Sequence, residues 1–168
     1  VRAADRLREN GIECPKVSVG STPTALSAVS LEGVSDLRAG VYVFFDLFQA
    51  GLGVCRMDDI ARSVLTTVVS HTTSHRRLIV DAGGLALSKD RGTAEQAVDC
   101  GYGLVADAAS GRLIPGLRVS SANQEHGIIE LPPGFDFQQF PLGSQLRILP
   151  NHACMTAAAH GSYFVMDG

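Results

Sequence analysis

The sequence predicts two parts, an α/β segment followed by a mainly β domain. Near the N-terminus, a helix-forming stretch is followed by a β-prone run and then by a second, almost continuously apolar run. From residue 64 onwards, short β-branched runs alternate with turns rich in Gly, Pro and Asn, a pattern typical of β structure. We place the boundary after residue 55, so the expected domains are residues 1–55 and 56–168.

The composition is that of a globular chain with no sign of polyanion binding. The 168 residues are 45% hydrophobic, and 14 Lys and Arg against 17 Asp and Glu give a net charge of −3. Because no dense basic run is present, we expect no binding to nucleic acid or to anionic membranes. No apolar stretch reaches the roughly 18 residues of a membrane span, and the charged N-terminal stretch does not suit a secretory signal. We therefore expect a cytoplasmic protein.

The four cysteines are expected to be reduced thiols. Cys14, Cys55, Cys100 and Cys154 are widely spaced and form no CxxC pair, and a chain of this length does not need disulfides for stability. The sequence begins at Val1 rather than at a methionine, and its first helix suits the middle of a longer chain. We therefore expect a fragment.

The first part is expected to alternate between helices and strands. Residues 3–10 are helix-forming and precede Gly11, which suits the position after a helix C-terminus. Residues 16–19 form a β-prone run that leads into a small polar turn at residues 20–24. Residues 40–46 form a second run, whose apolar character predicts a strand covered on both faces.

The second part is expected to consist mainly of strands, with no long helix. Residues 58–62 suit the start of a helix, but β-branched residues follow them. Strand-like runs bounded by turn residues then recur to the end of the chain. The expected strands cover residues 64–69, 77–81, 113–119, 127–131, 145–149 and 163–166.

His152 and Cys154 are candidate metal ligands. They follow the apolar run 146–149, and if extended structure continues, residues two apart point to the same face. Imidazole nitrogen and thiolate sulfur are both good zinc ligands, and two protein ligands leave positions open for water or substrate. The alternative is that Cys154 is an inert buried thiol and His152 is a hydrogen-bonded loop residue.

Two other segments contain polar groups that suit a binding site. Gly20, Ser21, Thr22 and Thr24 lie at a strand end, where small residues, hydroxyls and N–H groups suit a phosphate. From the residues alone, an ordinary capped turn is the preferred interpretation. The adjacent Glu125 and His126 suit an acid and base or partners that orient a metal ligand. A solvated surface pair is the alternative.

The remaining histidines are expected to be structural. His71 and His75 have i, i+4 spacing but lie between two β runs in a stretch rich in Ser and Thr, so a hairpin loop explains them better than a helical metal pair. His160 follows three alanines and has no partner nearby in the sequence.

Taken in order, five motifs resemble the D-serine dehydratase/D-threonine aldolase family. The resemblance spans essentially the whole chain, and its most specific parts are the last two motifs. It implies an alanine-racemase-like architecture, with an N-terminal (β/α)8 barrel that holds pyridoxal phosphate and a C-terminal β domain with the metal pair. Residues 1–55 would be the last barrel units. The motifs are residues 20–24, 40–46, 80–83 with 86–88, 125–127 and 150–154.

The same resemblance implies roles for individual residues. The phosphate of pyridoxal 5′-phosphate would contact Gly20, Ser21, Thr22 and Thr24, and Tyr42 would approach the cofactor ring. His126 and Asp81 would support the site, and His152 and Cys154 would hold zinc, or manganese in its place. The Schiff-base lysine of the family matches neither Lys16 nor Lys89, the two lysines present, so the chain is expected to be inactive alone.

The resemblance also implies a lyase that acts on small D-β-hydroxy-amino acids, in a homodimer. A His-x-Cys pair is the dehydratase-like pattern, whereas an Asp replaces the Cys in aldolases, so Cys154 favours the dehydratase. Thiolate prefers zinc, while carboxylate suits manganese or magnesium. Two alternatives remain, an amino-acid racemase on the same scaffold and a non-catalytic β module.

Overall fold

The computed structural model describes residues 1–166, which pack as two compact units. The first unit covers residues 1–43, and the second begins at Phe44. Residues 44–55, which the sequence assigns to the first part, therefore pack with the second. Their helix, α3 (Leu47–Gly51), is joined to the second unit by a hydrogen bond from the Phe48 N–H to the Asn151 carbonyl. That residues 1–55 derive from a barrel domain stays a prediction.

The first unit is a small α/β unit, as the sequence predicts. Its elements follow one another as α1 (Arg2–Glu9), β1 (Ser18–Val19), α2 (Thr22–Ser27), β2 (Asp36–Leu37) and the 3-10 helix η1 (Val41–Val43). β1 and β2 pair in parallel, and α2 connects them. Parallel neighbours joined through a helix are the connection that defines α/β structure.

The prediction of a strand at residues 40–46 is wrong. Val41–Val43 form η1 instead, and Phe45 has a positive φ of 51° that interrupts any extended run. Asp46 then caps α3, because its side chain accepts a hydrogen bond from the Gln49 N–H. The apolar pattern predicted burial but did not reveal this change of backbone direction.

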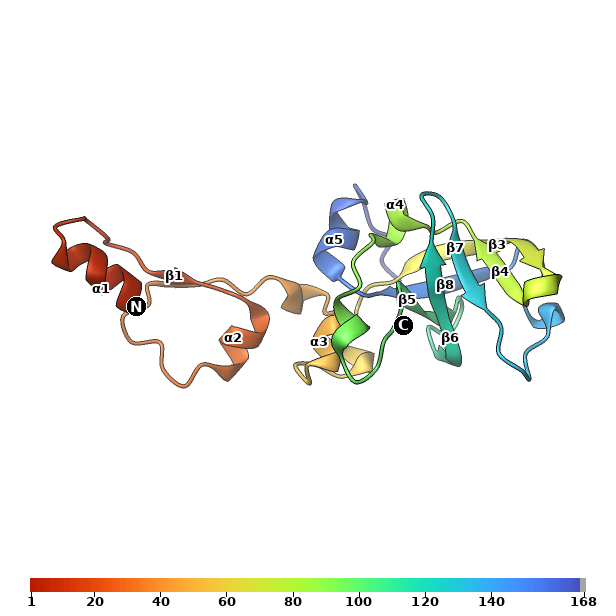
Figure 1. Ribbon diagram of the computed structural model, residues 1–168, viewed down its shortest axis with the longest axis horizontal. Helices are drawn as coiled ribbons and strands as arrows, with labels where there is room; N and C mark the ends of the chain where they lie inside the picture. Colours follow the sequence, from red (N-terminus) through yellow and green to blue (C-terminus); the bar gives the residue numbers. More distant parts are fainter. Residues whose placement is uncertain (167–168) are drawn as a thin grey trace. The chain divides into compact units, whose positions relative to one another are not determined.

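The second unit is a closed six-stranded barrel with the strand order β3-β4-β7-β6-β5-β8 (Figure 1). Every pair of neighbouring strands is antiparallel. Closure leaves no open sheet edge. The strands are β3 (Val64–Thr72), β4 (Arg77–Val80), β5 (Gly103–Asp107), β6 (Leu113–Ala122), β7 (Gly127–Glu130) and β8 (Gln145–Pro150).

The barrel interior is filled by alternate side chains of the strands. In β4, Leu78 and Val80 are completely buried, and Ile129 of β7 and Ile148 of β8 are buried with them. The strands were predicted from β-branched runs bounded by turn residues, and the alternation shows which of their side chains face the core. The main core cluster collects buried apolar residues from all six strands.

Five of the six strands expected in the second part are confirmed, at β3, β4, β6, β7 and β8. The prediction of a strand at residues 163–166 is wrong, since these residues form no strand and Phe164 is almost fully exposed. β5 was not predicted, because its short run lies between glycines. Residues 58–62 contain only the short 3-10 helix η2 (Met57–Asp59).

Short helices connect the strands. They are α4 (Gly84–Leu87), α5 (Ala153–Ala158) and the 3-10 helices η3 (Thr73–His75), η4 (Gly92–Glu95) and η5 (Phe137–Gln139). As expected, the second part has no long helix within the described residues. Among residues 1–166, none of the helices combines the length and the apolar content that a membrane crossing requires.

Candidate metal centre

His152 and Cys154 lie where β8 gives way to α5. β8 ends at Pro150, His152 is the N-cap residue of α5, and Cys154 lies in the first turn of that helix. We expected the strand to continue and to place both side chains on one face, and this prediction is wrong. The chain turns into a helix between them, so their candidate role rests on residue type and closeness in the sequence rather than on a shared strand face.

The imidazole of His152 is oriented by a carboxylate. Its Nδ1 lies 2.5 Å from Oδ2 of Asp90, and both side chains are about one third exposed, at 38% and 31%. With Nδ1 occupied, Nε2 is the nitrogen left to bind a metal. Cys154 is a free, exposed thiol, so it is not the inert buried cysteine of the alternative interpretation.

The residue before His152 is fixed by a buried polar network. The Asn151 side chain donates to the Thr93 hydroxyl at 2.8 Å and to the Gly101 carbonyl at 2.7 Å, and it accepts from the Thr93 N–H. Asn151 and Thr93 are almost fully buried. Because buried polar groups with all partners in place are costly to disturb, this network holds the backbone that leads into His152.

The residue after His152 is held from both sides. The carboxylate of Asp46 accepts the Ala153 N–H at 2.8 Å, and the Arg62 guanidinium donates to the Ala153 carbonyl at 3.0 Å. Both charged side chains are buried, and Arg62 lies against the rings of Phe44 and Tyr163. Ala153 therefore has a fixed backbone between the two candidate ligands.

The motif at residues 80–83 packs directly against the motif at residues 125–127. A Cβ on Gly83 would lie 2.4 Å from the His126 nitrogen, and a Cβ on Gly127 would lie 2.5 Å from the Ala82 carbonyl oxygen. The Gly84 N–H also donates to the Asn123 carbonyl. Glycine is required at these two positions because the two backbones touch.

Helix α4 links this contact to α5. The Thr156 hydroxyl of α5 donates to the Leu87 carbonyl at 3.0 Å, and His160 Nε2 contacts the Ala86 carbonyl at 2.9 Å. His160 is thus structural, as expected. The three motifs of the β domain are therefore connected through α4, which the sequence did not predict.

Asp81 and His126, expected to support the site, have different environments. Oδ1 of Asp81 accepts hydrogen bonds from the Thr66 hydroxyl and the Thr67 N–H, both at 2.7 Å. Burial acts to raise the pKa of Asp81, but these hydrogen bonds outweigh it and hold the pKa below its usual value. His126 lies exposed in the turn between β6 and β7. Their supporting role stays a prediction.

The expected cofactor-binding residues come together within the first unit. Ser21 caps α2, and its hydroxyl bonds to the exposed Thr24 hydroxyl at 2.8 Å. The buried Thr22 hydroxyl accepts the Tyr42 N–H at 3.1 Å. A Cβ on Gly20 would lie 2.5 Å from the Arg38 carbonyl oxygen. The structural contacts of Gly20 and Thr22 therefore explain why these residue types occur there. The hydroxyls of Ser21 and Thr24 are exposed instead.

His71 and His75 lie in the β3–β4 hairpin, as expected. His71 Nε2 contacts the Phe140 carbonyl at 2.7 Å, and its ring packs on Phe137. The hydroxyl of Ser74 contacts His75 Nδ1. Each of these contacts engages one ring nitrogen of its imidazole.

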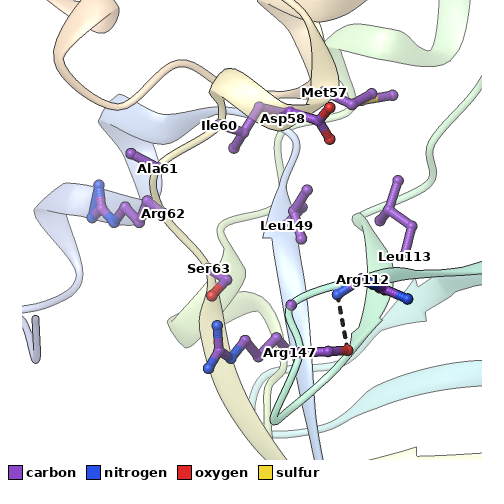
Figure 2. A pocket seen from close by; sticks show the side chains of 12 residues that line it. Met57, Asp58, Ile60, Ala61, Arg62, Ser63, Arg112, Leu113, Arg147 and Leu149 are labelled. Atoms are coloured by element: carbon purple, nitrogen blue, oxygen red, sulfur yellow. Dashed lines mark hydrogen bonds between the residues drawn. The ribbon is translucent and has the colours of Figure 1, made fainter. Parts of the chain in front are cut away.

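A pocket of about 410 Å³ opens beside β8. Figure 2 shows Leu149 and Arg147 of β8 on one side and the segment from Met57 to Ser63 on the other. In the same view, the Arg62 side chain points away from the pocket, toward the contacts described above. The pocket lining contains no histidine or cysteine, so it is distinct from the candidate metal centre.

The donor set of His152 and Cys154 fits a zinc ion that retains open positions. Nitrogen and sulfur ligands suit zinc, and fewer than four protein ligands are typical of catalytic sites. Within residues 1–166, no group of three or more His, Cys, Asp or Glu side chains is arranged to hold a metal. The described residues therefore contain two candidate ligands, one of them in contact with a carboxylate, and no closed structural site.

Comparisons with known proteins agree on one family. A model described as "Putative serine dehydratase domain" matches residues 61–166. The chain is 54% identical over 167 residues to D-threo-3-hydroxyaspartate dehydratase from Delftia sp. (strain HT23), covering 97% of this chain and 44% of that protein. It is 36% identical over 173 residues to D-serine dehydratase from Dictyostelium discoideum, covering 96% and 42%. To D-threonine aldolase from Arthrobacter sp it is 32% identical over 171 residues, covering 98% and 40%.

Solved structures extend the likeness to the fold. An Ala racemase-like protein from Idiomarina loihiensis matches with a TM-score of 0.85 and 49% identity, covering 94% of this chain and 42% of that one. The Delftia dehydratase matches with a TM-score of 0.84 and 54% identity, covering 96% and 44%. The expected mainly β domain of an alanine-racemase-like protein is thereby confirmed.

Two further structures are variants of a D-threo-3-hydroxyaspartate dehydratase. In one a histidine is replaced by alanine, and in the other a cysteine is replaced by alanine and the protein is in the metal-free form. The two substituted positions are separated by one residue. The present chain spans less than half the length of the curated relatives named above.

Proposed function

The chain belongs to the serine dehydratase domain family, and on this premise we propose that it is part of a metal-dependent, pyridoxal-phosphate-dependent lyase. The substrates we propose are small D-β-hydroxy-amino acids. We also propose that the protein forms a homodimer and is located in the cytoplasm. The lysine that would bind the cofactor is assigned to neither Lys16 nor Lys89, because both lie outside the family motifs.

One observation carries the proposal: an imidazole with a free nitrogen and an exposed thiol are separated by one residue in the sequence. His152 contacts Asp90 through Nδ1, which leaves Nε2, and Cys154 is a free cysteine at the surface. The related dehydratase has been solved with a histidine or a cysteine replaced, at the same spacing, and in a metal-free form. We propose zinc rather than manganese, because thiolate is a soft ligand.

The residues of this chain would hold and orient the reacting groups. Pyridoxal phosphate, when bound, supplies an electron sink for charge that develops at Cα, and zinc supplies a Lewis acid. His152 and Cys154 would hold the zinc. The fixed backbone of Ala153 would keep these two side chains in place while substrate binds, because its N–H and carbonyl are both engaged.

In the first unit, we propose that Ser21 and Thr24 contact the cofactor phosphate. Both side chains are exposed, and because the Ser21 hydroxyl donates to the Thr24 hydroxyl, the hydrogen of the Thr24 hydroxyl is left to donate to a phosphate. Gly20 and Thr22 would shape the turn, and Tyr42 would be positioned by the bond between its N–H and the Thr22 hydroxyl. Tyr42 is 56% exposed, which leaves its ring available for contact.

Dehydration is the favoured reaction. The presence of Cys154 follows the dehydratase-like pattern, and the identities to the two dehydratases, 54% and 36%, exceed the 32% identity to the aldolase. Dehydration of D-serine would yield pyruvate and ammonia. Aldol cleavage of D-threonine would instead yield glycine and acetaldehyde, and a racemase would yield the L-enantiomer.

The experiment that tests this function compares these outcomes in one assay. The purified protein, as encoded in its genome, is incubated with D-serine, D-threo-3-hydroxyaspartate and D-threonine, with the L-enantiomers as matched controls. We expect a 2-oxo acid and ammonia from the first two D-substrates, loss of activity after chelation, and recovery with zinc. Full activity in metal-free protein, or conversion to the L-enantiomer alone, would overturn the proposal.

A further inference from the structure

We propose that Asp90 is a positioning residue for zinc, which fixes the His152 ring so that Nε2 faces the metal. This inference rests on the proposed metal site at His152 and Cys154. Asp90 lies 62 residues from His152 in the sequence and in none of the family motifs, yet its Oδ2 is 2.5 Å from His152 Nδ1. Its role is to act through the histidine rather than to touch substrate.

The Asp90 carboxylate is itself held in place by its own loop. Oδ1 accepts the Gly92 N–H at 2.7 Å, and the Asp90 N–H donates to the Ser88 hydroxyl at 3.2 Å. One carboxylate oxygen is therefore anchored by the backbone while the other meets the imidazole. This division of the two oxygens orients the carboxylate before any metal binds.

The loop that carries Asp90 is tied to the loop that carries His152. Thr93 donates its N–H to the Asn151 side chain and accepts a hydrogen bond from it, and both residues are buried. These bonds lie one residue before His152 and three residues after Asp90. Since the two loops are joined beside the contact, the loop of Asp90 cannot move away from the loop of His152 as a whole without breaking a buried network.

Packing around Gly92 further limits the movement of the Asp90 loop. A Cβ at this position would lie 3.0 Å from the Phe48 ring and 3.2 Å from Oδ1 of Asp90. Phe48 belongs to α3, next to Asp46. The loop that carries the carboxylate is therefore packed closely against α3. This packing restricts Asp90 more than a side chain on a mobile surface loop would be restricted.

A role in stability alone does not account for this contact. The Asp90 and His152 side chains are about one third exposed, and an ion pair at that level of exposure contributes little to folding. A carboxylate that accepts the hydrogen of one imidazole nitrogen instead fixes the tautomer and increases the basicity of the other nitrogen. The geometry therefore points to the metal ligand.

The test measures zinc affinity by competition with a chromophoric chelator. We expect Asp90→Ala to weaken zinc binding by roughly 10- to 100-fold, as is usual when a partner of a ligating histidine is removed. Asp90→Asn, which keeps an acceptor oxygen, should weaken zinc binding less. Glu95→Gln is the matched control, since Glu95 lies in the adjoining η4, is exposed and makes no side-chain hydrogen bond within residues 1–166. The zinc affinity of this variant should equal that of the wild type.

A second readout follows the histidine ring itself. Nitrogen-15 NMR of metal-free wild-type protein should show His152 with its hydrogen on Nδ1, and Asp90→Ala should lose that preference. A ring that carries its hydrogen on Nε2 in the wild type would overturn the inference even if Asp90→Ala failed to fold.

The outcomes separate this inference from the proposed function. If His152→Ala and Cys154→Ala lose zinc while Asp90→Ala binds it as tightly as the wild type, Asp90 has no positioning role and the metal site stands. If His152→Ala retains full zinc affinity, the metal site fails and the inference fails with it. The inference is supported if both ligand variants lose zinc, if the Asp90 variants show the graded loss of zinc affinity, and if Glu95→Gln binds zinc as the wild type does.

Discussion

Oδ2 of Asp46 accepts a hydrogen bond at 2.8 Å from the backbone N–H of Ala153, a residue 107 positions later in the sequence. The other oxygen of Asp46 caps α3 through the Gln49 N–H. A single buried carboxylate therefore joins the start of the second unit to the peptide between the two proposed metal ligands. Arg62 completes the arrangement at the Ala153 carbonyl.

Removal of the Asp46 carboxylate should destabilise the second unit strongly. Asp46→Ala leaves two N–H groups without their acceptor, so we expect the free energy of unfolding to fall by about 2–4 kcal/mol, the sum of a lost cap and an unsatisfied buried donor. Asp46→Asn should cost about half as much, since the amide oxygen can serve one donor. Urea-induced unfolding measures both.

Asp136→Ala provides the control, because Asp136 is also an N-cap residue but lies at the surface, where it caps η5. Its substitution should cost no more than about 1 kcal/mol. An equal loss of stability at the two positions would show that the contact with Ala153 contributes nothing beyond ordinary capping.

Gly83→Ala should also destabilise the protein, because a Cβ there would meet the His126 nitrogen at 2.4 Å. Backbone atoms cannot rotate away as a flexible side chain can, so we expect a loss of about 2 kcal/mol or more. Gly161→Ala is the matched control, since no atom of the described residues lies within 4 Å of the added Cβ, and it should change stability by less than about 0.5 kcal/mol. Thermal unfolding of both variants distinguishes them, and similar melting temperatures would contradict the backbone contact.

These two tests address relationships that the sequence predicts to very different degrees. Runs of β-branched and apolar residues bounded by turn residues predicted five barrel strands correctly, since such runs suit the half-buried surface of a sheet. The same reasoning failed at residues 40–46, where a positive φ at Phe45 turns the chain, and at residues 163–166, which pair with no strand. Apolar character alone does not specify a hydrogen-bonding partner.

The candidate site was predicted only where its residues are neighbours in the sequence. His152 and Cys154 are two apart, but Asp90 and Arg62 lie 62 and 91 residues from the positions that they contact. No local pattern connects residues at that separation. The start of α5 could have been predicted from the sequence, because the run of alanines after His152 has high helix propensity. That run argues against the continued strand that we expected.

Asp81 should make the stability of the barrel depend on acid pH. Burial alone would raise its pKa, but hydrogen bonds from the Thr67 N–H and the Thr66 hydroxyl hold the pKa below the ordinary 3.8. Because the folded-state pKa is the lower one, ionised Asp81 stabilises the fold above about pH 4, and this contribution is lost as the pH falls through the folded-state value.

Asp81→Asn should therefore lower the free energy of unfolding at pH 7, and the difference from wild type should shrink as the pH falls below about 4. Unfolding in denaturant at a series of pH values measures the difference. Thr66→Val, which removes one of the two hydrogen bonds to Oδ1, should reduce the pH dependence without abolishing it. A difference that stays constant from pH 7 to pH 3 would rule out this role of the carboxylate.

The central claim is that His152 and Cys154 together hold one zinc ion, and native mass spectrometry with elemental analysis tests it most directly. Protein stripped by a chelator and then supplied with zinc should contain one zinc per chain. His152→Ala and Cys154→Ala should each retain little or none, while His75→Ala, which removes an exposed hairpin histidine, should retain one. Equal zinc content in the wild type and in both ligand variants would contradict the claim.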